Sequence, residues 1–361
     1  QGYPDGSTVY SYNRKIVGST SITCPFTMGT NDTWTIHIFT TPLHYQVDLT
    51  YGVITDDSHI NPSGPAALVL GPVNVVMNHV VAGVITETAN ITLGNNLGSN
   101  IDSPTRTVSL GYELHNTTEE LYKCGTITQY RVPAMQSRAD LFMGPTATPY
   151  TCTQIATIPF DQTQALQTPN SHKWGASEGV YAVALPDPNN CYSPALGQNV
   201  LIRVGTSVYN NAVGGGNRSP RWSPLNCVGT FVTDLNPQSK FTLDFRQTLE
   251  TRPQATDTFG LELATGHLPV DTLFLKMYKR MIPNIAPGVP VRFNSLGKWF
   301  RGIVDVADKV LPHVVQYLPP KAQLIATPLA AGVNMLNNKL KQQQSELNKI
   351  KTEQKLEQSK P

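Results

Sequence analysis

One string in the chain has the pattern of a hydrolase nucleophile. GASEG at 175–179 fits G-x-S-x-G, which in hydrolases places the serine, here Ser177, on a tight turn between a strand and a helix. In this chain the string is followed by VYAVALP, which has the composition of a strand. So short a pattern also arises by chance in a chain rich in glycine and serine. We therefore expect no serine hydrolase and no enzymatic turnover.

Metal chemistry has one candidate group. Asp56, Asp57 and His59 stand together between two expected strands, and carboxylate oxygens are the ligands that Ca²⁺ prefers. One interpretation is a Ca²⁺ site at a contact surface with Asp56 and Asp57 as ligands, and the other, which we favour, is a solvated turn. The eight histidines include no H-E-x-x-H, so catalytic zinc has no support. His37 lies in an alternating strand, where we expect it to pack against neighbours.

The five cysteines are spread along the chain and include no C-x-x-C pair, which favours reduced and mostly buried thiols. No Walker loop or dinucleotide-binding fingerprint occurs, and no cofactor is expected. No apolar run is long enough for a transmembrane helix, and the first residues lack the apolar core of a secretory signal.

Charge is divided unevenly along the 361 residues. Residues 1–270 hold 13 Lys and Arg against 19 Asp and Glu, whereas residues 271–361 hold 14 against 6. The net charges are therefore −6 and +8. Such a division indicates that the two parts meet different surroundings, with the basic part facing a polyanion. An ordinary basic tail without a partner is the alternative.

The first 255 residues are expected to be almost entirely β. Seven runs are rich in β-branched and aromatic residues, and most of them alternate with a period of two. These runs are 33–40, 45–55, 105–116, 125–133, 179–186, 199–209 and 240–250. Many strands without alternating helices predict an all-β sandwich or jelly roll.

The pattern changes to a helical period after Pro253. Asp271 is a plausible N-cap, Phe274, Met277, Tyr278 and Met281 would share one helix face, and Pro283 would end the helix. A second amphipathic helix is expected over 295–318. We expect it to dock on a sheet or on a neighbour's helix, and the alternative is a transient contact with a membrane. The tail over 337–361 is too polar to pack.

Several blocks, in order, resemble the coat proteins of small icosahedral positive-strand RNA viruses of the insect nodavirus-like and permutotetravirus-like kind. The first block is RTVSLGYELHNTTEELYKCGTITQYRVP, and the later ones are WGASEGVYAVALPDPNN, FTLDFRQTLETRPQ and LKMYKRMIPNIAPGVPVRFNSLGKWF. The residues that carry the first and third matches are Arg106, Gly111, Asn116, Thr117, Leu121, Gly125, Thr128, Glu250 and Pro253. The resemblance covers roughly residues 30–320.

The resemblance implies an eight-stranded jelly-roll β-sandwich of the viral capsid type with a helical C-terminal extension. It implies a homo-oligomeric icosahedral shell of the T=3 type around genomic single-stranded RNA, found in the virion and assembled in the host cytoplasm. A host receptor would be a further partner, which the sequence does not identify. Ca²⁺ at subunit interfaces would be the one ion to consider.

The expected domains are an N-terminal arm (1–19), a jelly-roll shell domain (20–255), a helical internal C-terminal region (256–336) and a polar tail rich in Lys and Gln (337–361). Family members commonly begin with an Arg-rich arm. Here either that arm precedes Gln1, or the basic residues after 271 do its work. Surface projections are expected from loops such as 56–100 and 186–225.

RNA contacts are expected where the positive charge gathers, because Lys and Arg neutralise phosphates and release counterions. The residues we expect to make them are Lys276, Lys279, Arg280, Arg292, Lys298 and Arg301, with Lys339, Lys341, Lys349 and Lys351 secondary. The alternative to a coat protein is a carbohydrate-binding, lectin-like β-sandwich module with aromatic residues grouped on one exposed face.

Overall fold

The computed structural model describes most of the chain up to residue 291. The described ranges are 10–54, 59–94, 105–133, 139–143, 149–186, 196–197, 200–204, 207–210, 221–223, 225–253, 258–265, 272–281 and 285–291. All of them belong to the compact unit Gln1–Val291, whereas the second unit, Arg292–Pro361, lies outside the described residues.

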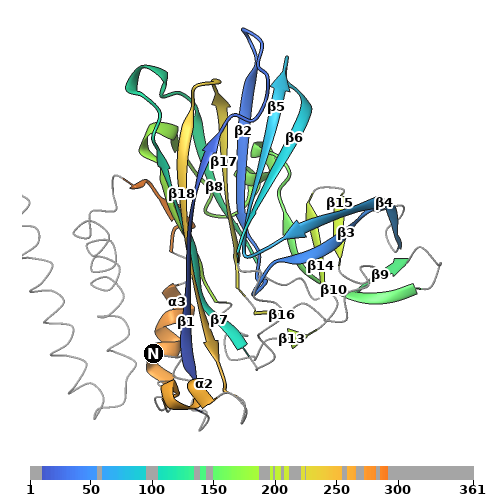
Figure 1. The fold of residues 1–361 in the computed structure, drawn as a ribbon, viewed down its shortest axis with the longest axis vertical. Coiled ribbons are helices and arrows are strands. Elements are labelled where there is room, and N and C mark those ends of the chain that lie inside the picture. Colours follow the sequence, from blue (N-terminus) through green and yellow to red (C-terminus); the bar gives the residue numbers. More distant parts are fainter. Residues whose placement is uncertain are drawn as a thin grey trace, which may run out of the picture. The chain divides into compact units, whose positions relative to one another are not determined.

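Two antiparallel sheets face each other and form a β-sandwich (Figure 1). The first sheet has the order β1 (Tyr12–Thr23), β18 (Lys240–Thr251), β7 (Thr105–Asn116), β12 (Val180–Ala184) and β19 (Gly288–Val289). The second has the order β11 (His172–Gly175), β8 (Thr126–Val132), β17 (Cys227–Leu235), β2 (Thr33–Thr40), β5 (Val73–Val81) and β6 (Val84–Leu93). The all-β sandwich predicted from the sequence is confirmed.

Eight of these strands are paired in a nested order. β1 pairs with β18, β2 with β17, β7 with β12 and β8 with β11, so the first strand meets the last and each inner pair lies within the next. A long hairpin rolled up in this way is a jelly roll. The jelly roll predicted from the sequence has eight strands in all, whereas these two sheets hold five and six. The additional strands are β19, which extends one sheet, and the β5–β6 hairpin, which extends the other.

The main hydrophobic core fills the space between the two sheets. Every second residue of the central strands points inward, as the pleat requires. The largest fully buried side chains of this core are Trp34, Tyr112, Phe241, Ile22, Ile36 and Ile38. Each contributes roughly 1.5–3 kcal/mol by leaving water. This core holds the two sheets together.

The connection between β7 and β8 lies within the first sequence block that resembles the coat proteins. β7 ends in an Asn-Thr-Thr turn, a short 3₁₀ turn follows (η2, Glu120–Tyr122), and β8 begins just after Gly125. Gly125 has φ = +96°, and a Cβ there would lie 2.5 Å from the carbonyl oxygen of Thr233. A side chain at this position would therefore clash as well as strain the backbone.

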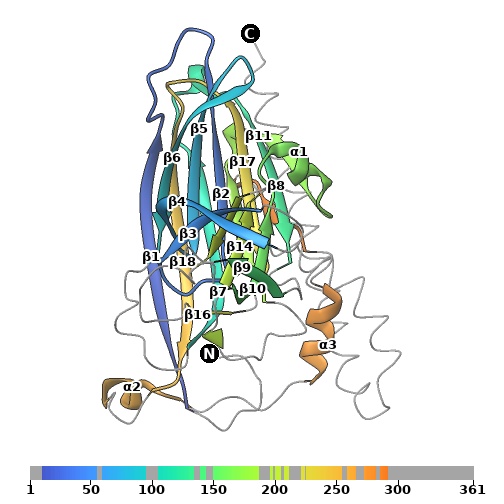
Figure 2. The same cartoon turned by 90° about the vertical axis from the view of Figure 1, so that its right-hand side faces the viewer.

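A six-stranded closed barrel is built from three insertions into the sandwich. Its order is β10 (Pro149–Ile158), β14 (Val200–Val204), β15 (Ser207–Asn210), β3 (Val47–Ile54), β4 (His59–Leu70) and β9 (Ala139–Met143). The insertions follow β2, β8 and β12, and nested pairing brings the ends of these three strands to the same end of the sandwich (Figures 1 and 2). The last insertion also holds the short pair β13 (Leu196–Gly197) and β16 (Arg221–Trp222).

A second hydrophobic core lies on the outer face of the six-stranded sheet. It joins Phe39, Tyr130 and Phe231 of this sheet to residues of the barrel strands, such as Ile158 and Ile202. Ala165 of the helix α1 (Gln162–Gln167) completes it. This face of the sheet is therefore covered by the insertions.

His37 packs within this second core. Its ring stacks on Phe231 with centroids 3.9 Å apart, and its Nε2 is 2.8 Å from the hydroxyl oxygen of Tyr130. Burial lowers the pKa of His37 to about 3. The expectation that His37 packs against its neighbours is confirmed.

The structure corrects several expected boundaries. Residues 12–19, expected to belong to an arm, form most of β1, because the strand pairs with β18 along twelve residues. Residues 59–93, expected within a surface loop, form β4, β5 and β6, and Val73, Val75 and Met77 of β5 are buried in the main core. The run 199–209, expected as one strand, holds the antiparallel strands β14 and β15.

A buried ion pair joins two of the blocks that carry the family resemblance. Arg106 Nε donates to Glu250 Oε2 at 2.6 Å, and both side chains are less than 10% exposed. The hydroxyl of Ser11 donates to the other carboxylate oxygen of Glu250, also at 2.6 Å. The group therefore fastens β7, β18 and the start of β1 together.

Replacing Glu250 with Ala should lower the free energy of unfolding by about 3–5 kcal/mol, because Arg106 would remain buried without its carboxylate. Urea titration measures this change. Asp244→Asn, on the outer face of β18, is the control and should change the value by less than about 0.5 kcal/mol. Equal effects of the two variants would contradict the structural role of the buried pair.

Stability should also depend on His37 in mild acid. The unfolded chain binds a proton at this histidine near pH 6.5, whereas the folded state resists it down to about pH 3. Stability is therefore lost as the pH falls through this window. Relative to His37→Phe, the chain should lose about 2 kcal/mol between pH 7 and pH 5. Urea titrations at both pH values test this, with exposed His172→Phe as the control, and a constant difference would refute it.

Candidate nucleic-acid interface

The chain leaves the sandwich at the end of β18 and continues into the basic part. The helix α2 (Thr258–Leu263) comes first. Just after it, Thr265 exchanges two backbone hydrogen bonds with Ser11, with N···O distances of 2.9 and 3.1 Å. The exit is thus fixed beside the start of β1.

The helix α3 carries the three described members of the expected RNA-binding set. It spans Thr272–Met281, in agreement with the helix predicted from the apolar period. Met277, Tyr278 and Met281 are half-buried, whereas Lys276, Lys279 and Arg280 are exposed. Residues at i, i+3 and i+4 share one face of a helix, so the three cations lie together. Such a group can bind phosphate groups.

Tyr278 fixes this helix to the sandwich. Its hydroxyl donates a hydrogen bond of 3.1 Å to the carbonyl oxygen of Pro186, just after β12. The apolar face therefore turns toward the protein while the cations face away.

A strap over residues 285–291 then returns to the sandwich, where Arg131 of β8 holds it. The guanidinium donates to the carbonyl oxygens of Ile285 and Ala286 at 2.8 and 3.1 Å. Burial lowers the pKa of Arg131, but an arginine stays protonated in a protein. Two charge-assisted hydrogen bonds from one planar group fix both the position and the direction of the strap.

The strap also joins the first sheet as β19. Gly288 pairs with Ala182 and Val289 with Tyr181 of β12. Gly288 is required here, because a Cβ would lie 2.9 Å from the side-chain amide of Gln129 and 3.0 Å from the carbonyl oxygen of Tyr181. The chain therefore approaches both sheets at their common edge.

A buried chain of polar groups connects this strap to the core. The Tyr112 hydroxyl is 2.5 Å from Thr230 Oγ1, which donates to the side chain of Gln129. The amide nitrogen of Gln129 donates in turn to the carbonyl oxygen of Pro287 at 3.4 Å. The network crosses from one sheet to the other, so a change in the position of the strap would alter hydrogen bonds within the core.

The structure describes only part of the predicted sites. Arg292, Lys298 and Arg301 lie outside the described residues, as do Asp56 and Asp57, the helix expected over 295–318 and the tail over 337–361. Among the residues that are described, no group of three or more His, Cys, Asp or Glu could hold a metal ion. Within the same ranges no helix is long and apolar enough to cross a membrane.

Arg131, Gln129 and Tyr278 are residues whose contribution was not predicted from the sequence. Gln129 and Arg131 stand within the strand TITQYRV, and polar side chains that become buried need hydrogen-bond partners. Their presence in this strand was the one available sign of such contacts. Their partners are backbone carbonyls more than 90 residues away, which no local pattern reveals.

The GASEG string builds a turn between β11 and β12. Ser177 lies in the 3₁₀ turn η3 (Ala176–Glu178), and a strand follows it, as predicted. Gly179 has φ = +62°, and a side chain there would collide with the carbonyl oxygen of Leu114. The carbonyl of Gly179 accepts a hydrogen bond of 2.9 Å from the indole of Trp174. Gly179 and Trp174 thus have a structural explanation.

No protein-family model and no curated protein matches the chain. Among solved structures, the decameric BFDV capsid protein has 10% identity and a TM-score of 0.27, over 68% of this chain and 99% of that one. The infectious bursal disease virus Gx strain structure has 11% identity and a TM-score of 0.24, over 83% and 96%. TM-scores this low carry no argument, and the assignment of the fold rests on strand order.

Replacing Arg131 with Gln should release the strap while the sandwich stays folded, because two charge-assisted hydrogen bonds are lost. Amide hydrogen exchange should become at least tenfold faster at Gly288 and Val289, which corresponds to about 1.4 kcal/mol. Arg246→Gln, at an exposed position of β18, is the control and should leave this exchange unchanged. An unchanged rate in Arg131→Gln would show that other contacts hold the strap.

Proposed function

We propose that the chain is a viral capsid protein that self-assembles into a closed icosahedral shell and packages genomic single-stranded RNA. The observation that carries this proposal is the nested strand order, in which β1 meets β18 and three insertions leave one end of the sandwich. Jelly rolls of this order are the fold of many viral capsid domains. The order of the sequence blocks that resemble coat proteins agrees with it.

Lectins also use jelly rolls, so the fold alone does not distinguish a coat protein from a carbohydrate-binding module. The residues exposed on the faces of the sheets distinguish the two functions. A carbohydrate-binding module needs aromatic side chains on an exposed face. The aromatic residues on the outer face of the six-stranded sheet, Phe39, Tyr130 and Phe231, are buried in the second core. The exposed positions on β1 of the other sheet are largely Ser, Thr, Asn and Lys, which suits contacts between subunits. The lectin alternative is therefore not favoured.

The basic helix supports a role in RNA packaging. Lys276, Lys279 and Arg280 point away from the apolar face of α3, and Arg131 holds the strap beyond the helix. In this proposal the cations after residue 291 also bind RNA, at phosphates and without base specificity. The protein would act in the virion, after assembly in the host cytoplasm, and without enzymatic turnover. A T=3 arrangement, which the resemblance to coat proteins implies, is part of this proposal.

One experiment tests both parts of the proposal. Purified protein should form closed particles far larger than the 39.4 kDa chain in size-exclusion chromatography and negative-stain microscopy, and these should contain RNA. Lys276→Gln, Lys279→Gln and Arg280→Gln together should leave particle size unchanged and lower the RNA content. They should also lower the salt dependence of RNA binding by about 0.7 for each lost phosphate contact.

The matched control replaces three exposed cations of the sandwich, Lys173, Lys240 and Arg246, with Gln. This variant should keep its RNA. A lone subunit of about 40 kDa under all assembly conditions would refute the shell. Normal RNA content in the helix variant would refute the role of α3.

A further inference from the structure

The strand β1 lies at the edge of the five-stranded sheet and has one unused side. Within the part of the chain that the structure describes, it pairs only with β18. The bridge from Ser11 to Thr265 shows which backbone groups face the other side. Because these groups alternate along a strand, the N–H and C=O of Asn13, Lys15, Val17, Ser19, Ser21 and Thr23 point to the free edge. Such an edge is a template for another strand.

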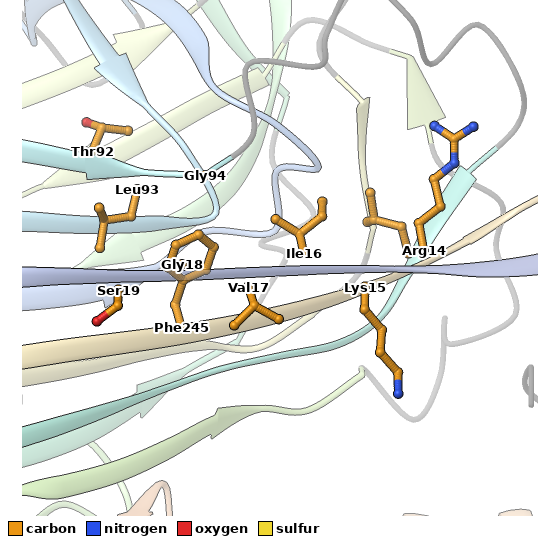
Figure 3. A pocket seen from close by; sticks show the side chains of 11 residues that line it. Arg14, Lys15, Ile16, Val17, Gly18, Ser19, Thr92, Leu93, Gly94 and Phe245 are labelled. Atoms are coloured by element: carbon orange, nitrogen blue, oxygen red, sulfur yellow. The ribbon is translucent and has the colours of Figure 1, made fainter.

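An open groove of about 680 Å³ runs along this edge, on the inner side of the sheet. Figure 3 shows Ile16 and Phe245 on the groove side of β1, with Thr92 and Leu93 of β6 opposite. A side chain at Gly18 would collide with the Phe245 ring, so the glycine lets this ring lie against the strand. The groove therefore has an apolar floor beside a row of backbone donors and acceptors. This combination fits an added β-strand, which brings both backbone groups and alternate side chains.

The charges of β1 select the strand that would fit. In YNRKIVGSTSIT, both cations stand in the first half, and the second half is rich in Ser and Thr. An antiparallel copy of the same strand, centred on Val17, places Lys15 opposite Ser19 and Arg14 opposite Thr20. A parallel copy in register would instead place like charges directly opposite each other, which is unfavourable.

The same register also suits the apolar residues. Val17, the central residue of this arrangement, lies on the outer face of the sheet, and its side chain is 67% exposed. Pairing about this residue would place it against Val17 of the other copy. On the inner side it would place Ile16 of each copy opposite Gly18, beside the Phe245 ring at the floor of the groove. A β-sheet formed about a twofold axis is a self-complementary, isologous contact.

We propose that β1 pairs antiparallel with β1 of a second copy of this chain about a twofold axis at Val17, joining two five-stranded sheets into one. This contact rests on the proposed function, since it would be one of the subunit contacts of the shell. Charged side chains on an edge strand usually oppose pairing with other strands. In this contact the cations near one end of β1 would also set the register.

Engineered cysteines test the register. Val17→Cys should form a disulfide-linked dimer under mild oxidation, because directly opposite residues have Cα atoms about 5.5 Å apart, within disulfide range. Ser21→Cys and Asn13→Cys are matched controls on the same face of the strand. Each would lie about 26 Å from its own copy and should not crosslink alone. The double variant Asn13→Cys/Ser21→Cys should crosslink, because these two positions lie opposite each other.

Non-reducing gels measure these dimers, with the unsubstituted chain giving the background from its own five cysteines. No excess dimer for Val17→Cys, or self-crosslinking of either control, overturns the proposal. Microscopy of the same samples separates it from the shell. Particles without the Val17→Cys crosslink would leave the shell standing and remove this contact. A crosslinked dimer that never forms particles would keep the contact and remove the shell.

Discussion

The pairing of the first strand with the last is the constraint on which the rest of the structure depends. β1 and β18 lie more than 200 residues apart in the chain, yet they pair along twelve residues. All other strand pairs of the jelly roll are nested inside this one, so the main core closes only when the two ends meet. Closing a loop of this length costs conformational entropy before most of the stabilising contacts have formed. A fold of this kind therefore forms slowly. The Arg106–Glu250 ion pair with Ser11 strengthens the same junction.

The nested order also explains where the additional parts lie. Successive connections alternate between the two ends of the sandwich. The insertions after β2, β8 and β12 therefore meet because of the strand order, and no sequence motif within each insertion is needed to bring them together. Each contributes two barrel strands, and each pair alone would be marginal in water. Together they close a barrel and bury the aromatic face of the six-stranded sheet. His37 is buried as a consequence, and burial is the cause of its low pKa.

The exit segment links the fold to the proposed function. The side chains of Arg131 and Gln129 donate to backbone carbonyls of this segment, and the segment's own Tyr278 hydroxyl donates to the carbonyl oxygen of Pro186. Such contacts fix the path of the chain through backbone carbonyls. Lys276, Lys279 and Arg280 consequently stay on the exposed face of α3, as a phosphate-binding surface requires. The lysine and arginine in the last turn also favour the helix itself, since they oppose the partial negative charge at its C-terminus.

The sequence by itself determined the local features. Alternation of β-branched and apolar residues located β2, β7 and β18, and the apolar period with Pro283 located α3, because these patterns depend only on neighbours along the chain. The division of charge at residue 271 was equally visible. Only the tertiary structure decided that Arg106 meets Glu250, that Arg131 holds the strap, and that residues 12–19 belong to a strand rather than an arm. These features rest on partners far away in the sequence, and a residue's own type and spacing do not specify which distant backbone or carboxylate will reach it.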